Sequence, residues 1–115
     1  MHKVDRNWGY YKVLLEGNGY LVKELTIHPG KYLSNQRHQH RKEEWLVVSG
    51  SINVVLQTDH ALERSLVFNK GDKLTIQKKM WHHVGNIGNE DAKIIEVWMG
   101  DILDEEDIER KKSLT

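Results

Sequence analysis

The 115-residue sequence contains no cysteine and a single proline. Without cysteine the chain can form neither a disulfide framework nor a thiolate-bound metal site, which fits a reducing compartment. No apolar run is long enough to cross a membrane, and the opening stretch M-H-K-V-D-R-N-W contains no apolar segment able to act as a signal. We therefore expect a cytoplasmic protein without a membrane partner.

The sequence also lacks an excess of either charge. Lys and Arg together number 17, as do Asp and Glu, so the formal net charge is zero. A neutral chain produces no overall field that attracts nucleic acid, and any anionic ligand must be bound by cations placed locally. The length suits one hydrophobic core, and we expect a single domain over residues 1–115.

Short apolar runs broken by glycine recur along most of the chain, a pattern typical of an all-β sandwich or barrel. The first two runs, residues 8–16 and 20–28, flank Gly17-Asn18-Gly19, which tolerates the positive φ angles of a tight hairpin. In the second run, alternation places Lys23 in an otherwise apolar row. From Asp104 onward acidic residues precede basic ones, which suits a helix dipole and predicts a short C-terminal helix.

Candidate metal ligands are concentrated in one stretch, S-N-Q-R-H-Q-H-R-K-E-E-W-L-V-V-S-G, between Ser34 and Gly50. They are an amide, two imidazoles and two carboxylates: Gln36, His38, His40, Glu43 and Glu44. The first three alternate, so in an extended chain their side chains share one face. These groups bind divalent metals in proteins that lack cysteine. The stretch therefore predicts a metal site on a β scaffold.

Two sets of residues follow a recognisable order. The first is a glycine, His-x-His, a glutamate and a later glycine: Gly30, His38, His40, Glu43 or Glu44, and Gly50. The second lies in G-D-K-L-T-I-Q-K-K-M-W-H-H-V-G-N and comprises Gly71, His82 and Asn86. Together they resemble the two metal-binding motifs of the cupin superfamily, which are small antiparallel β-barrels. Gln77 and Lys79 replace the usual proline and glycine, so the local turn departs from the family pattern.

Four longer sequence segments show which cupin family the chain resembles most. They are R-N-W-G, V-K-E-L-T-I-H-P-G-K-Y-L-S-N-Q, H-R-K-E-E-W-L-V-V-S-G and I-E-V-W-M-G-D-I-L-D-E-E-D-I-E-R. In this order they are similar to the type II mannose-6-phosphate isomerase (phosphomannose isomerase) domain, often fused behind a mannose-1-phosphate guanylyltransferase domain that this chain does not include. The resemblance implies a cupin jelly-roll β-barrel. It also implies interconversion of mannose 6-phosphate and fructose 6-phosphate through an enediol.

The resemblance further implies one divalent metal ion, zinc in the first place, with manganese, iron, cobalt or nickel as alternatives. The implied ligands are Gln36, His38, His40, Glu43 and His82, more groups than one site needs. The wider cupin spacing favours Glu44, whereas the phosphomannose isomerase pattern favours Glu43. Strand alternation lets only one of the two point inward, and we follow the phosphomannose isomerase pattern in choosing Glu43.

Aldose–ketose isomerisation requires a base near the operating pH and a group that stabilises the developing oxyanion. We expect His83 or Glu44 to carry the proton, and we place the family-matched Arg110 with them in the catalytic set. The phosphate requires local cations, for which the candidates are Lys23, Arg41, Lys31, Arg6 and Arg110. Glu96 interrupts its strand face and is expected to hold a sugar hydroxyl or orient a ligand.

Two alternatives keep the fold and change the function. One is a cupin that acts on another sugar or a nucleotide-linked sugar, and the other is a non-catalytic module that binds a sugar or a metal. The expected partner is a small sugar phosphate. Exposed strand rows at a barrel edge fit a homodimer, and the tryptophans Trp8, Trp45, Trp81 and Trp98 are expected in the core or the dimer interface.

Overall fold

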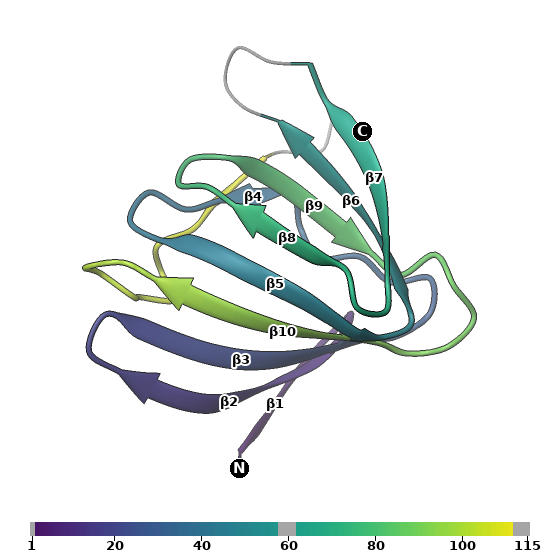
Figure 1. Ribbon diagram of the computed structural model, residues 1–115, viewed down its shortest axis with the longest axis horizontal. Helices are drawn as coiled ribbons and strands as arrows, with labels where there is room; N and C mark the ends of the chain where they lie inside the picture. The colour runs from purple at the N-terminus through teal and green to yellow at the C-terminus, as the bar shows by residue number, and fades with distance from the viewer. Residues whose placement is uncertain (1, 58–61, 112–115) are drawn as a thin grey trace.

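Two antiparallel sheets make up the computed structural model, which describes residues 2–57 and 62–111 (Figure 1). The larger sheet has six strands in the order β1-β2-β3-β10-β5-β8, and the smaller has five in the order β11-β4-β9-β6-β7. The strands are β1 Lys3–Arg6, β2 Gly9–Gly17, β3 Tyr20–Ile27, β4 Gln36–Arg37, β5 Lys42–Ser49, β6 Ser51–Gln57, β7 Arg64–Asn69, β8 Lys73–Ile76, β9 Trp81–Gly85, β10 Ala92–Met99 and β11 Glu109–Arg110. The all-β jelly-roll prediction is confirmed, although within the described residues the sheets form an open sandwich instead of one closed barrel.

Glycines make two tight turns possible, a hairpin within the larger sheet and a connection between the two sheets. The pairing of β2 with β3 ends at Gly17 and Tyr20, so Gly17-Asn18-Gly19 forms the predicted hairpin. Gly50 turns β5 into β6 with a φ of 74°, and a Cβ atom there would lie 2.8 Å from the backbone oxygen of Asp91. Both the conformation and the close contact therefore require glycine at position 50.

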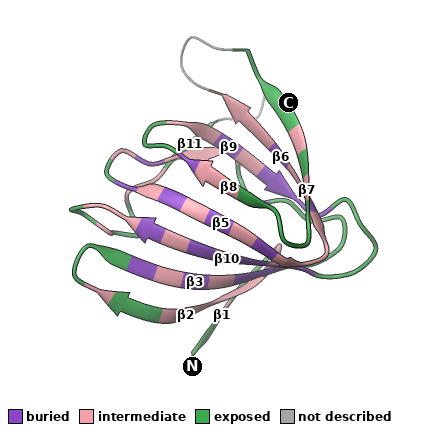
Figure 2. Cartoon of the chain, in the orientation of Figure 1, coloured by how far each residue is buried: buried purple, intermediate pink, exposed green. Residues whose placement is uncertain are grey.

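An apolar core fills part of the space between the sheets. Buried residues alternate with more exposed ones along β3, β5 and β10, as the changing colours of these strands show (Figure 2). The core consists of Leu25, Ile27, Leu33, Trp45, Val47, Ile52, Val54, Ile76, Val84, Ala92 and Ile94. Burying each large aliphatic side chain is worth roughly 1.5–3 kcal/mol, so these contacts are the main source of stability.

The inward-facing rows of β3, β10 and β5 become polar toward one end of the sandwich. There the buried side chains are Lys23, Glu96 and Glu43. The antiparallel register places Glu96 opposite Lys23 and Trp98 opposite Glu43. Three strands therefore deliver polar groups to the same region, and this region forms the candidate site.

The predicted C-terminal helix is wrong, because no helix occurs in residues 2–57 and 62–111, and none of these segments could span a membrane as a helix. The chain turns at Asp104, whose carbonyl accepts a hydrogen bond from the N–H of Asp107 at 3.0 Å. It then forms β11, which pairs antiparallel with β4. Ile108 is the single apolar residue between Asp104 and Lys111, so a helix there would have no apolar stripe to bury.

The turn before β9 forms without the proline and glycine of the family pattern. Lys79 has a φ of 64° and is the one non-glycine residue with positive φ in the described part of the chain. Its N–H donates to the carbonyl of His38 at 2.7 Å, and the N–H of Met80 donates to the carbonyl of Gln77 at 3.2 Å. Lysine thus occupies a left-handed conformation that glycine adopts more easily.

Candidate metal centre

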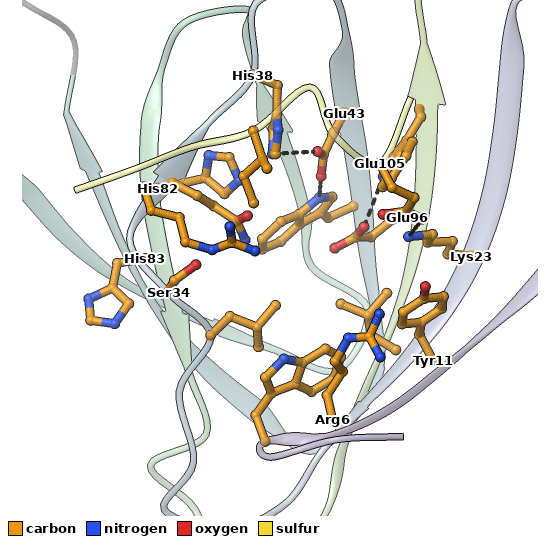
Figure 3. Close-up of a pocket in the computed structure, with 18 of the residues that line it drawn as sticks. Arg6, Tyr11, Lys23, Ser34, His38, Glu43, His82, His83, Glu96 and Glu105 are labelled. Atoms are coloured by element: carbon orange, nitrogen blue, oxygen red, sulfur yellow. Dashed lines mark hydrogen bonds and ion pairs between the residues drawn. The ribbon is translucent and has the colours of Figure 1, made fainter. Parts of the chain in front are cut away.

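Three buried ligand groups form a cluster at the polar end of the sandwich (Figure 3). They are His38, which follows β4, Glu43 in β5 and His82 in β9. Their ligand atoms lie within 4.8 Å of one another, and His38 Nε2 is 3.2 Å from Glu43 Oε2. Since β5 belongs to the larger sheet and β4 and β9 belong to the smaller, the cluster bridges the two sheets.

Backbone carbonyl groups determine which nitrogen of each histidine faces the cluster. The Nδ1 of His38 donates to the carbonyl of Asp107 at 2.7 Å, and the Nδ1 of His82 donates to the carbonyl of Met80 at 3.0 Å. Because a carbonyl can only accept, Nδ1 carries the proton in both rings. Burial lowers the pKa of His38 to about 4 and also lowers the pKa of His82. Both rings are therefore neutral, and each keeps an Nε2 lone pair for a cation.

Glu43 completes the cluster as a carboxylate. Burial alone raises its pKa, but the positive charge of Arg41 and the hydrogen bond from Trp45 act in the opposite direction, and the pKa of Glu43 is lowered. Trp45 Nε1 donates to Oε1 at 2.8 Å, and Arg41 Nε donates to Oε2 at 2.9 Å. These bonds hold the carboxylate in one orientation.

Two imidazole nitrogens and one carboxylate oxygen form a donor set that suits Zn²⁺ and related divalent ions. Their fixed Nδ1 protons add the outer hydrogen bonds typical of metal-binding histidines. The guanidinium of Arg41 lies against the same groups, with Nη2 3.1 Å from His38 Nε2. The residues fit a divalent cation, provided that Arg41 gives up its contact with His38.

The two other expected ligands lie in different places. Gln36 is half-buried, lines the pocket and is paired with His82 between β4 and β9. His40 is exposed and does not line the pocket, because the chain bends at Gln39 and His40 and strand alternation does not apply there. The structure thus brings Gln36 to the cluster and contradicts the placement of His40 in it.

The prediction that Glu44 carries a proton in the pocket is also contradicted. Glu44 follows Glu43 in β5 and therefore lies on the opposite face of the sheet. Its carboxylate accepts a hydrogen bond from Thr75 Oγ1 at 2.6 Å and lies 3.5 Å from the ammonium of Lys42. The inward carboxylate of the pair is Glu43.

The cluster opens into a pocket of about 650 Å³, a size typical of small-molecule sites. Lys23 lies in its wall and is 4% exposed. Its ammonium is 4.0 Å from the ring centroids of both Tyr11 and Trp98 and 2.5 Å from Glu105 Oε1. Arg41 stacks on Trp98 at 3.3 Å, so the pocket offers two buried cations beside one aromatic ring.

The remaining predicted residues divide between the rim of the pocket and the outer surface. Arg6 and Arg110 are exposed and line the pocket, as does the half-buried His83, which lies at its edge 5.7 Å from the ring of Tyr32. Lys31 is exposed and does not line the pocket. The phosphate contact expected for Lys31 stays a prediction.

Glu96 lies inside the pocket beside the cluster. It is 4% exposed, and Trp98 Nε1 donates to its Oε1 at 3.1 Å. Burial raises the pKa of Glu96 to about 8, and the negative charge of Glu43 acts in the same direction. Its carboxyl is consequently able to exchange a proton near neutral pH.

Sequence reasoning missed the part of the site that comes from the C-terminal segment. The acidic run that contains Glu105 and Asp107 predicts the start of a helix, yet both residues contact residues of the pocket. The signal available in the sequence was the closing string of the isomerase resemblance, which contains Asp107. Trp45 lies in the core as expected, and both Trp8 and Trp98 line the pocket.

Solved structures with the same fold confirm the cupin architecture. The chain aligns with an oxalate decarboxylase from Lactobacillus farciminis at a TM-score of 0.83 and 20% identity, covering 95% of this chain and 33% of that one. It aligns with the capsular polysaccharide assembling protein CapF from Staphylococcus aureus at a TM-score of 0.84 and 19% identity, covering 97% and 34% of the two chains. At this identity the likeness establishes the fold alone.

Relatives found by sequence share a higher identity with the chain than these solved structures do. The chain is 36% identical to the alginate biosynthesis protein AlgA of Pseudomonas aeruginosa and 35% identical to a mannose-1-phosphate guanylyltransferase of Escherichia coli, over 94% of this chain in both cases. It spans about a fifth of the length of these relatives, 21% and 22%. Residues 1–113 match the family model described as mannose-6-phosphate isomerase C-terminal. The chain therefore belongs to the family of mannose-6-phosphate isomerase C-terminal domains.

Proposed function

We propose that the chain binds one divalent metal ion and isomerises a sugar 6-phosphate, interconverting mannose 6-phosphate and fructose 6-phosphate. The observation that carries the proposal is the cluster of His38, Glu43 and His82, which opens into a pocket with its own buried cations. Gln36 is the fourth candidate ligand, because it lines the pocket beside His82. Membership of the isomerase family supports the choice of substrate.

A bound metal supplies a Lewis acid that stabilises negative charge on the sugar oxygens. Lys23 and Arg41 then bind the phosphate from the pocket wall, and Arg6 and Arg110 bind it from the rim. The neutral net charge of the chain makes these local cations the groups that attract the anion.

Glu96 moves the proton between adjacent sugar carbons. Its carboxyl is buried in the pocket, and its pKa of about 8 lets it both accept and release a proton near neutral pH. His83 is the alternative carrier, because it lines the same pocket from the edge. Burial of Glu96 and its neighbours limits access of water to the transferred proton.

The test follows mannose 6-phosphate conversion by the purified protein with Zn²⁺, Mn²⁺, Fe²⁺, Co²⁺ or Ni²⁺ and with a chelator. We expect turnover with at least one metal, loss of turnover with the chelator, and loss of bound metal in His82→Ala. The matched control is His28→Ala, since His28 is exposed and lies outside the pocket. Absence of turnover with every metal would contradict the proposal.

A second function, binding without catalysis, is favoured by the contact of Arg41 with His38 and Glu43. This contact places a guanidinium against two of the three candidate ligand groups. A protein of this kind would bind mannose 6-phosphate in the presence of chelator and convert none of it. An isomerase acting on another sugar would instead convert a different aldose phosphate under the same conditions.

A further inference from the structure

The segment of residues 104–110 lies beside the cluster of His38, Glu43 and His82 and contacts the two buried cations next to it. Arg41 Nη1 donates to the carbonyl of Asp104 at 3.4 Å, and Lys23 pairs with Glu105. The segment ends in β11, which pairs with β4 next to Gln36. A stretch distant in sequence therefore forms one side of the site.

Asp107 makes the densest set of these contacts. Its carbonyl accepts the Nδ1 proton of His38 at 2.7 Å. Its carboxylate oxygens accept the backbone N–H groups of Gln39 and His40, each at 2.9 Å. One residue thus holds both the ring of a candidate ligand and the backbone that follows it.

The backbone between β4 and β5 needs this support. Residues 38–41 belong to no strand, so their N–H groups lack ladder partners of the kind that fix Glu43 and His82. A bend held by a carboxylate keeps a single conformation, whereas a bend exposed to water samples several. The direction in which His38 Nε2 points depends on that bend.

We infer that Asp107 is a positioning residue of the metal centre, which orients His38 without binding the ion. This inference rests on the proposed function, because it assumes that His38, Glu43 and His82 hold a metal. Outer hydrogen-bond partners of metal ligands typically change metal affinity by about 10- to 100-fold when removed. Asp107 lies in the closing string of the isomerase resemblance. Its contacts with residues 38–40 distinguish it from the exposed acidic residue Glu106.

The experiment measures the dissociation constant of Zn²⁺ by competition with a chelating dye, for the full chain and three variants. We expect Asp107→Ala to bind Zn²⁺ about tenfold or more weakly, because two N–H groups lose their acceptor and the bend that carries His38 loses its fixed conformation. Asp107→Asn keeps one acceptor oxygen and should lie between Asp107→Ala and the unaltered protein. Glu106→Ala is the matched control, since Glu106 is an exposed carboxylate on the same turn, and it should stay within twofold.

A second readout follows the tautomer of His38 in the metal-free protein by proton–nitrogen NMR of the histidine rings. We expect the Nδ1–H form in the unaltered protein. Asp107→Ala keeps the main-chain carbonyl of residue 107, and we expect a mixture of both forms there because the loosened bend moves His38 away from that carbonyl. Circular dichroism establishes that each variant is folded, and Asp107→Asn decides the question if Asp107→Ala does not fold. Unchanged Zn²⁺ affinity in a folded Asp107 variant, or no Zn²⁺ binding by the unaltered protein, would overturn the inference. Zn²⁺ binding without sugar conversion would instead contradict the proposed isomerase and leave the role of Asp107 intact.

Discussion

Besides the two neutral histidines of the cluster, four buried side chains at the polar end are ionisable: Lys23, Arg41, Glu43 and Glu96, each at most 5% exposed. With Glu96 protonated, two buried cations face one buried carboxylate, and the other carboxylate that contacts Lys23, that of Glu105, is largely exposed. Burying unbalanced charge is costly, and an anionic ligand offsets that cost. The protonation state of Glu96 therefore matters for both ligand binding and stability.

The raised pKa of Glu96 predicts a stability that falls with pH in the metal-free protein. Between its ordinary value of 4.5 and about 8, the folded state binds a proton that the unfolded state has released. The free energy of unfolding must then decrease as pH rises through this window. Glu96→Gln removes the effect, so relative to the unaltered protein it should gain on the order of 2–4 kcal/mol between pH 4.5 and 8.

Urea denaturation in the presence of a chelator, at pH 5 and pH 8, measures this difference. The control is Glu16→Gln, because Glu16 is exposed on β2. A Glu96→Gln variant whose stability follows the same pH course as the unaltered protein would refute a raised pKa.

Lys79 provides a prediction about the backbone. A side chain in the left-handed region costs about 1–2 kcal/mol, and glycine avoids that cost while losing roughly 0.5–1 kcal/mol of chain entropy. Lys79→Gly should accordingly raise the free energy of unfolding by about 0.5–1 kcal/mol. Its neighbour Lys78 does not have positive φ, so Lys78→Gly should lower stability by a similar amount. Thermal or urea unfolding of the two variants side by side tests the opposite signs.

At the scale of elements, the contact between Lys23 and Glu105 joins β3 to the segment before β11. The carboxylate of Glu105 contacts the ammonium of Lys23, which is one of the groups proposed to bind the substrate phosphate. A phosphate must therefore displace Glu105, whose side chain is 58% exposed and free to turn outward. The segment competes with the ligand for one cation.

Removing this competition should tighten anion binding. Glu105→Gln is expected to lower the dissociation constant of inorganic phosphate by up to about fivefold, since a partly exposed ion pair is worth roughly 0.2–1 kcal/mol. Isothermal titration calorimetry measures the change, and Glu106→Gln serves as a control that should behave like the unaltered protein. Weaker binding in Glu105→Gln would indicate that Glu105 supports the phosphate site.

Regular strands were the elements that could be predicted. In β3, β5 and β10 the period of two decides which side chains point inward, so Lys23, Glu43 and Glu96 could be placed from sequence. His40 lies in a bend, where side chains do not alternate, so alternation placed His40 on the inward face although it is exposed. The contact of His38 with Asp107 spans 69 residues and depends on how the chain closes, which no local pattern encodes.

At the scale of the whole molecule, the cluster connects one strand of the larger sheet to two segments of the smaller sheet. A bound ion would thus link the two halves of the sandwich and stabilise only the folded state. Zn²⁺ at about 100 times its dissociation constant should raise the free energy of unfolding by about 2.7 kcal/mol. Thermal unfolding with and without Zn²⁺ measures the shift, which a chelator should reverse.

His82→Ala tests the origin of that shift. The variant should lose the response to Zn²⁺ while His28→Ala, altered at an exposed position, keeps it. An equal response in both would place the ion elsewhere. The homodimer expected from the sequence stays a prediction, which light scattering of the purified protein checks.

The guanidinium of Arg41 within the cluster has a consequence for metal selection. Every ion that enters must first displace it from His38, so the same free energy is subtracted from the affinity of each metal. Ions that bind imidazole tightly, such as Zn²⁺ and Ni²⁺, keep the highest affinity after this cost. Mg²⁺ and Ca²⁺ prefer oxygen ligands and start from a weaker affinity at such a site. Displacement of Arg41 would therefore lower every affinity by the same factor, leave the order of the metals unchanged and leave Mg²⁺ and Ca²⁺ as the weakest binders.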